Sequence, residues 1–178
     1  MTKQNRAVLT GLSIMTIAAA GLLLLLLLLD TSNGFTKAST FIIGGEYLGQ
    51  DGVVMQTKQN NCGPSALKMI FDHYKIASSL DEIEKAVHLT KSGSTMRSLK
   101  ELAESKGLKA AGWKLTMKDF IASPVPSLLF VHDDHFIVVD SVVGNSVFIR
   151  DPAIGKIKMT ERKLQEIWKG ETLIFSLK

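Results

Sequence analysis

The chain has 178 residues, a length that supports one globular domain with a short appendage. Its net charge of +4 is modest, and Lys and Arg are spread along the chain without interleaved aromatics, which argues against nucleic-acid binding. The single cysteine, Cys62, excludes an intrachain disulfide and a cysteine-based zinc site. We expect neither a metal nor another cofactor.

The N-terminus carries a long apolar segment. Residues 7–29 hold no charged side chain, and their number exceeds the roughly 20 residues that a helix needs to cross a bilayer. Lys3 and Arg6 precede the segment, so we expect residues 1–29 to be a transmembrane anchor in a bacterial inner (cytoplasmic) membrane. The remaining chain would then lie outside the cytoplasm. A signal peptide cleaved near residues 32–34 is the alternative, and it would make the protein secreted.

A linker and the start of the main domain come next. Residues 30–46 are rich in Ser, Thr and Gly and are typical of a linker, which leaves 47–178 for the domain. Residues 52–56 are expected to form a short strand. A helix should begin at Cys62, since Asn61 is a suitable N-cap and Pro64 suits the first turn. Its buried face is predicted from apolar side chains at helical spacing: Ala66, Leu67, Ile70, Phe71 and Tyr74.

Shorter elements follow, and each has a recognisable start signal. Ser79 with Glu82 is a capping box for a helix that reaches about Val87. Ser94 or Thr95 should cap another helix, which Gly107 ends. A short strand is predicted over residues 113–115 and a helical turn over 116–121.

The second half is dominated by strand patterns. β-branched and large apolar residues predict strands, and a Gly144-Asn145 turn predicts a hairpin. The strands are expected over residues 127–131, 136–143, 147–150 and 172–177, with one amphipathic helix over 160–168. Helices first and antiparallel strands second indicate an α+β fold.

Cys62 is a candidate nucleophile because a helix N-terminus stabilises a thiolate. A thiol needs a base, and His135 is the candidate because it stands next to the start of a rigid apolar strand. The other histidines fit less well. His73 lies three helical turns beyond Cys62, and His88 is expected at the surface. His132 flanks the Asp133-Asp134 turn on the side opposite to His135 and does not open the strand.

Two further residues would complete a catalytic set. Asp151 ends the strand that follows the hairpin, so antiparallel pairing can bring it beside His135 to orient the imidazole. Gln56 lies six residues before Cys62 and can supply one oxyanion donor, with the backbone N–H of Cys62 as the other. Gln59 is a rival for the role of Gln56.

Together these residues resemble the bacteriocin-processing, or double-glycine leader, peptidases, a family of papain-like cysteine peptidases. The likeness covers about residues 50–176. It rests on four ordered blocks: Gln56-x5-Cys62-Gly63, the helix over 94–107, Pro126-Ser127-Leu128-Leu129 with His135-Phe136-Ile137-Val138-Val139, and Asp151-Pro152-Ala153-x-Gly155. The resemblance implies a papain-like fold, with Cys62 at a helix N-terminus packed on a C-terminal antiparallel sheet.

The resemblance also implies a function. Cys62 would attack, His135 would move the proton, Asp151 would orient His135, and Gln56 would hold the oxyanion. The expected substrate is a leader peptide cut after Gly-Gly, with a separate export transporter as a further partner. The alternatives are a non-catalytic domain that binds leader peptides for an export system and a cysteine-dependent amide or peptidyl transferase. The chain's own Gly44-Gly45 raises the further question of self-processing.

Overall fold

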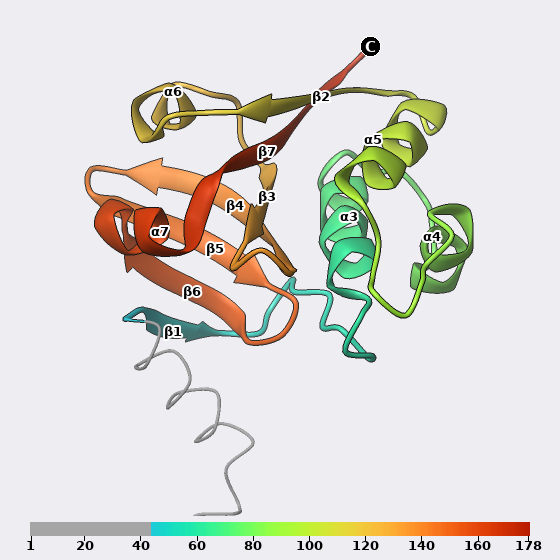
Figure 1. The fold of residues 1–178 in the computed structure, drawn as a ribbon, viewed down its shortest axis with the longest axis horizontal. Coiled ribbons are helices and arrows are strands. Elements are labelled where there is room, and N and C mark those ends of the chain that lie inside the picture. Colours follow the sequence, from blue (N-terminus) through green and yellow to red (C-terminus); the bar gives the residue numbers. More distant parts are fainter. Residues whose placement is uncertain (1–43) are drawn as a thin grey trace, which may run out of the picture. The chain divides into compact units, whose positions relative to one another are not determined.

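The computed structural model describes residues 44–178. Its first half supplies three helices that lie together on one side of the domain, as Figure 1 shows. They are α3 (Cys62–His73), α4 (Leu80–Ala86) and α5 (Met96–Ser105). Two further helices, α6 (Met117–Ile121) and α7 (Glu161–Ile167), lie beside the strands of the second half.

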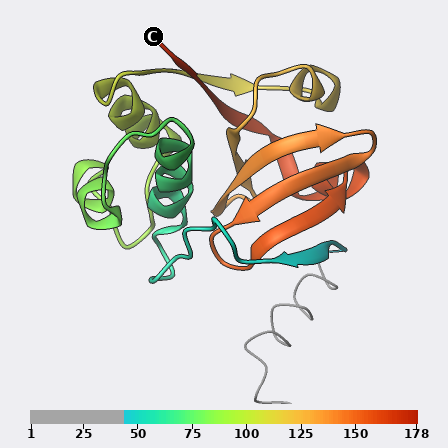
Figure 2. The same ribbon diagram turned by 180° about the vertical axis from the view of Figure 1, so that it is seen from behind.

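A seven-stranded sheet forms the other part of the domain, seen from behind in Figure 2. The strand order is β1-β6-β5-β4-β3-β7-β2, and every neighbouring pair is antiparallel. The strands are β1 (Glu46–Gly49), β2 (Leu108–Lys114), β3 (Ser127–Val131), β4 (His135–Val143), β5 (Ser146–Asp151), β6 (Gly155–Thr160) and β7 (Trp168–Leu177). The expected α+β class and papain-like architecture are confirmed.

Successive side chains on the central strands point to opposite faces of the sheet, so the core consists of two clusters, one on each face. On β3, Leu128 packs into a cluster with α3, α4 and α5, whereas the next residue, Leu129, packs into a second cluster with α6 and α7. Phe136 and Ile137 on β4 divide in the same way. Both faces are therefore covered, and β4, which begins with His135, packs against α3.

Local capping explains where the helices begin. The Ser79 hydroxyl accepts from the Glu82 N–H, and the Glu82 carboxylate accepts from the Ser79 N–H, so the predicted capping box is present. Thr95 caps α5 with Ser98 in the same way. Asn61 occupies the N-cap position of α3, but its side chain makes no capping bond.

Some predicted strands differ from the observed ones. Residues 52–56 form no strand, whereas β1 and β6 were not predicted. The two missed strands pair with each other, Glu46 opposite Lys158, across more than 100 residues of sequence. Because β1 is only four residues long and β6 includes two lysines among its six residues, the local pattern signals both strands weakly.

The predicted localisation is corrected. Within residues 44–178, no helix has both the length and the apolar character needed to cross a membrane. The apolar segment 7–29, from which a single-pass protein with an extracytoplasmic domain was predicted, lies outside the described residues. Residues 30–43 of the predicted linker also lie outside the described residues, whereas Glu46, the last residue of that linker, begins β1.

The Gly44-Gly45 pair packs beside the sheet. A Cβ built on Gly45 would lie 2.6 Å from Ile157 Cγ2, so the glycine backbone rests directly on β6. Asp151 pairs with Gly155 at the start of β6, and the strand runs from there toward Gly45. Cleavage of this pair by the same molecule would require the chain before β1 to leave β6.

Candidate active site

Cys62 is the first residue of α3, and its side chain is buried, with 6% of its surface exposed. The first backbone N–H groups of a helix have no partner within the helix, and they carry the positive end of the helix dipole. The thiol therefore sits where a negative charge is stabilised. Gly63 follows it without room for a side chain, because a Cβ there would lie 2.2 Å from Ser94 Oγ.

His135 and Asp151 meet at neighbouring strand ends. His135 begins β4 and Asp151 ends β5, which is hydrogen-bonded to β4. His135 Nε2 lies 2.8 Å from Asp151 Oδ1, and the Ala153 N–H donates to the same oxygen over 2.7 Å. Since Nε2 is engaged by the carboxylate, Nδ1 is the ring nitrogen left for the thiol.

Coupling between Cys62 and His135 favours the charged pair. Burial alone would raise the pKa of the Cys62 thiol, but a hydrogen bond and the charge of His135 outweigh it, so this pKa is lowered. The backbone N–H groups of Phe136 and Gly63 act in the same direction. Burial would lower the pKa of His135, yet hydrogen bonds to Asp151 and Cys62 raise it to about 10. Both shifts favour a thiolate beside an imidazolium.

The two candidate oxyanion glutamines have different surroundings. The Gln56 N–H donates to the Pro152 carbonyl over 2.8 Å, which fixes Gln56 beside Asp151. Its Oε1 is buried and accepts no hydrogen bond from the described residues. Gln59 is exposed on the turn before Cys62, and it lines the cleft at the thiol. Gln59 therefore lies at the cleft, whereas Gln56 is the more firmly held.

A cleft of about 380 Å³ opens at Cys62. It is lined by the loop over residues 91–94 and by the aromatic pair Phe130 and Phe136, whose ring centroids are 4.9 Å apart. Asp133 and Asp134 also line it.

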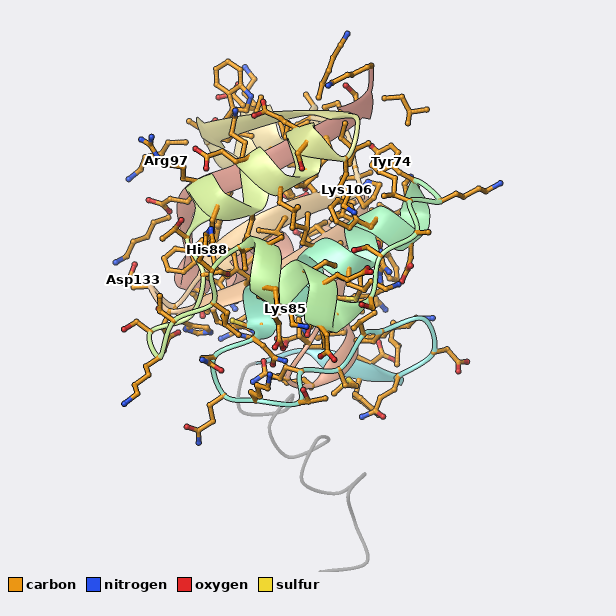
Figure 3. All side chains as sticks on the ribbon, turned by 90° about the vertical axis from the view of Figure 1, so that its right-hand side faces the viewer. Tyr74, Lys85, His88, Arg97, Lys106 and Asp133 are labelled. Carbon is orange, nitrogen blue, oxygen red and sulfur yellow. The ribbon has the colours of Figure 1, made fainter. Side chains whose placement is uncertain are left out.

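Of the four histidines, only His135 is near the thiol. His73 is the last residue of α3, at the far end from Cys62, and His88 lies on the helical side of the domain, as Figure 3 shows. His132 is exposed and has a positive φ of 55°. Within residues 44–178, no group of three or more His, Cys, Asp or Glu side chains is placed to hold a metal ion.

Sequence reasoning missed the residues that support the site. Glu84, which accepts from Asn61, lies outside the four sequence blocks, and so do Phe130 and residues 91–93, which line the cleft. The only sequence signal for Glu84 was its place on the inner face of a partly apolar helix. Glutamate in a helix is usually exposed, so this signal was weak.

Comparison with known proteins agrees with the peptidase family that the sequence resembles. A profile of the peptidase C39 family matches residues 50–178. An uncharacterized protein of Methanothermobacter thermautotrophicus is 29% identical over 127 residues, which cover 71% of this chain and 89% of that protein. The lactococcin-G-processing and transport ATP-binding protein LagD of Lactococcus lactis is 25% identical over 68% of this chain, a match that spans 18% of the transporter.

Solved structures share the fold. A double glycine motif protease from an AMS/PCAT transporter, in complex with the leader peptide, aligns with a TM-score of 0.69 at 24% identity. The alignment covers 75% of this chain and 98% of that one. The peptidase domain of Streptococcus ComA aligns with a TM-score of 0.66 at 23% identity, over 71% of this chain and 98% of that one.

Proposed function

This chain belongs to the peptidase C39 family and is a cysteine peptidase, and we propose that it cuts peptides through a Cys62–His135–Asp151 triad, after Gly-Gly in a leader peptide. The observation that carries the proposal is the 2.8 Å contact of His135 Nε2 with Asp151 Oδ1, in a domain where Cys62 begins α3. The pKa values of His135 and Cys62 are shifted by each other in the directions that favour the charged pair. This arrangement supplies a thiolate, a proton donor and an orienting carboxylate in one place.

In the first half of the reaction, the Cys62 thiolate attacks the scissile carbonyl carbon and forms a tetrahedral oxyanion. We assign the oxyanion donors to the Gln56 side-chain amide and the Cys62 backbone N–H, because both are held by fixed backbone. The His135 imidazolium then gives its proton to the leaving amine, the C–N bond breaks, and a thioester remains on Cys62.

In the second half, neutral His135 removes a proton from water, which attacks the thioester. The C–S bond breaks, the leader peptide leaves with a new carboxylate, and the thiolate–imidazolium pair returns. Asp151 keeps the imidazole ring in one orientation through both halves. If an amine took the place of water, the same residues would carry out peptidyl transfer.

Two findings support a Gly-Gly substrate. The rings of Phe130 and Phe136 and the loop over residues 91–94 line the cleft at Cys62, so we expect little space for large side chains beside the thiol. The structural relative from the AMS/PCAT transporter is a double glycine motif protease that binds a leader peptide. A separate export transporter is the partner that such a substrate implies.

The test is cleavage of a synthetic peptide in which a leader with a Gly-Gly end is followed by several further residues, with the products identified by mass spectrometry. Wild-type protein is expected to give a leader with a free carboxylate and a second fragment with a free amine, whose masses sum to the substrate plus one water, and Cys62→Ala is expected to give neither. A matched peptide with Gly-Leu in place of Gly-Gly should be cut far more slowly. Equal cleavage by Cys62→Ala would refute the triad, equal cleavage of both peptides would refute the specificity, and products joined to an added amine would indicate a transferase.

A further inference from the structure

Glu84 is a buried carboxylate outside the cleft. It lies on α4, with only 8% of its surface exposed, whereas its neighbours Asp81 and Lys85 are exposed. Figure 3 shows Lys85 on the helical side of the domain. Glu84 is not among the residues that line the cleft at Cys62, so nothing in the proposed reaction uses it directly.

Both carboxylate oxygens of Glu84 are engaged by the loop that precedes Cys62. Oε1 accepts from Asn61 Nδ2 over 2.7 Å, and Oε2 accepts from Lys58 Nζ over 2.5 Å. Hydrogen bonds from Lys58 and Asn61 lower the pKa of Glu84, although burial by itself would raise it. The bond to Glu84 also raises the pKa of Lys58. The buried charge is therefore compensated by this loop.

Asn61 joins Glu84 to the inside of the loop. The Asn61 side chain is fully buried, and besides its bond to Glu84 it donates to Thr57 Oγ1 over 3.1 Å. Its Oδ1 accepts from the Lys58 N–H over 3.1 Å. These bonds explain why Asn61 makes no capping bond to α3. They close the turn over residues 57–61, which separates Gln56 from Cys62.

We propose that Glu84 is a positioning residue for the nucleophile loop (residues 56–62): through Asn61 and Lys58 it fixes the spacing between the Gln56 amide and Cys62. The inference rests on the proposed function, in which these two groups form the oxyanion site. A loop tied only at its ends, by Pro152 at Gln56 and by α3 at Cys62, could shift the Gln56 amide. Displacements of about 1 Å in a catalytic constellation can cost on the order of 10²-fold in rate.

The test exchanges the donor and the acceptor of the Asn61–Glu84 bond. Asn61→Asp places two carboxylates against each other and should lower kcat by about 10- to 100-fold, with little change in KM, because neither residue lines the substrate wall that Phe130 and Phe136 form. In the double variant Asn61→Asp with Glu84→Gln, the new amide at position 84 can donate to the new carboxylate at position 61 and accept from Lys58. We expect kcat to return to within about threefold of wild type.

Two further measurements separate positioning from general stability. Glu101→Gln makes the same carboxylate-to-amide change at an exposed position in the middle of α5, and it should leave kcat and the melting temperature unchanged. Alkylation of Cys62 by iodoacetamide depends on the thiolate and His135 rather than on the oxyanion site. Its rate should stay within about twofold in Asn61→Asp while hydrolysis falls.

The results can overturn the inference in three ways. The inference is wrong if Asn61→Asp keeps the wild-type kcat. It is also wrong if the double variant regains the wild-type melting temperature but not the wild-type kcat. A fall in alkylation that matches the fall in kcat would also overturn it, because the defect would then lie in the thiol. The proposed function fails separately, when the wild-type protein shows no cleavage that depends on Cys62.

Discussion

His135 and Asp151 lie 16 positions apart in sequence, yet His135 Nε2 is 2.8 Å from Asp151 Oδ1. The Asp151 carboxylate is fixed from a second side by the Ala153 N–H, within the turn that joins β5 to β6. Orientation of the imidazole is therefore built into the ends of two paired strands. The rate of the reaction and its pH dependence should both depend on this pair.

Removal of the Asp151 carboxylate should impair catalysis while leaving substrate binding almost intact. In Asp151→Ala the imidazole loses its partner and its fixed orientation, so we expect kcat to fall on the order of 10²-fold. Steady-state kinetics with the Gly-Gly leader peptide provides the measurement. Asp151→Asn keeps a hydrogen-bonding group at the same place and should lose less. If Asp151→Ala retained wild-type kcat, Asp151 would have no orienting role.

The pH profile of kcat/KM should reflect the coupled thiol and imidazole. Activity should fall on the acid side when the Cys62 thiolate is protonated, at a pH below the ordinary thiol value of 9.0 because His135 lowers this pKa. It should fall on the alkaline side as His135 loses its proton, near a pKa of about 10. Asp151 helps to raise the pKa of His135, so Asp151→Asn should move the alkaline limb to lower pH. An alkaline limb that does not move would contradict this coupling.

Exchange of each glutamine near the thiol should identify the oxyanion donor. Loss of one oxyanion donor typically costs about 10²- to 10³-fold in kcat, so Gln56→Ala should show a loss of this size. Gln59→Ala should change KM more than kcat, because Gln59 is exposed at the cleft edge and has no fixed partner among the described residues. The reverse order of effects would assign the oxyanion role to Gln59.

The sequence predicted most elements whose signals are local. The Ser79–Glu82 capping box, the start of α3 at Cys62 and the hairpin at Gly144 need only neighbouring residues, and all three are present. The strands β1 and β6 were missed because they are short and pair with each other from distant parts of the chain. The buried bond between Asn61 and Glu84 was missed for a similar reason, since Asn61 looks like an ordinary N-cap in sequence.

Gly63 should not tolerate a side chain. A Cβ at this position would lie 2.2 Å from Ser94 Oγ and 3.1 Å from Phe136 Cδ2, so Gly63→Ala should destabilise the fold by about 1–3 kcal/mol and reduce activity. Thermal unfolding and peptide cleavage measure the two effects.

Ser94→Ala provides the matched test of that explanation. Ser94 Oγ is buried and has no hydrogen-bond partner among the described residues, so its removal should cost little by itself. Combined with Gly63→Ala, it should restore part of the lost stability, because it removes the atom nearest to the new methyl group. Additive losses in the double variant would show that the clash lies elsewhere, for example with Phe136.

Arg150 should stabilise the segment that carries Gln56. Its guanidinium donates to both carboxylate oxygens of Asp140, over 2.7 and 2.6 Å, and also to the Gly52 carbonyl over 3.1 Å. Lysine keeps the charge but cannot reproduce this planar set of donors. Arg150→Lys should therefore lower the stability by about 1 kcal/mol and reduce kcat severalfold through the Gln56 segment. The effect of Arg150→Lys on kcat should disappear in the Gln56→Ala background, because the oxyanion donor is already absent there. An equal loss of kcat in both backgrounds would show that Arg150 does not act through the segment that carries Gln56.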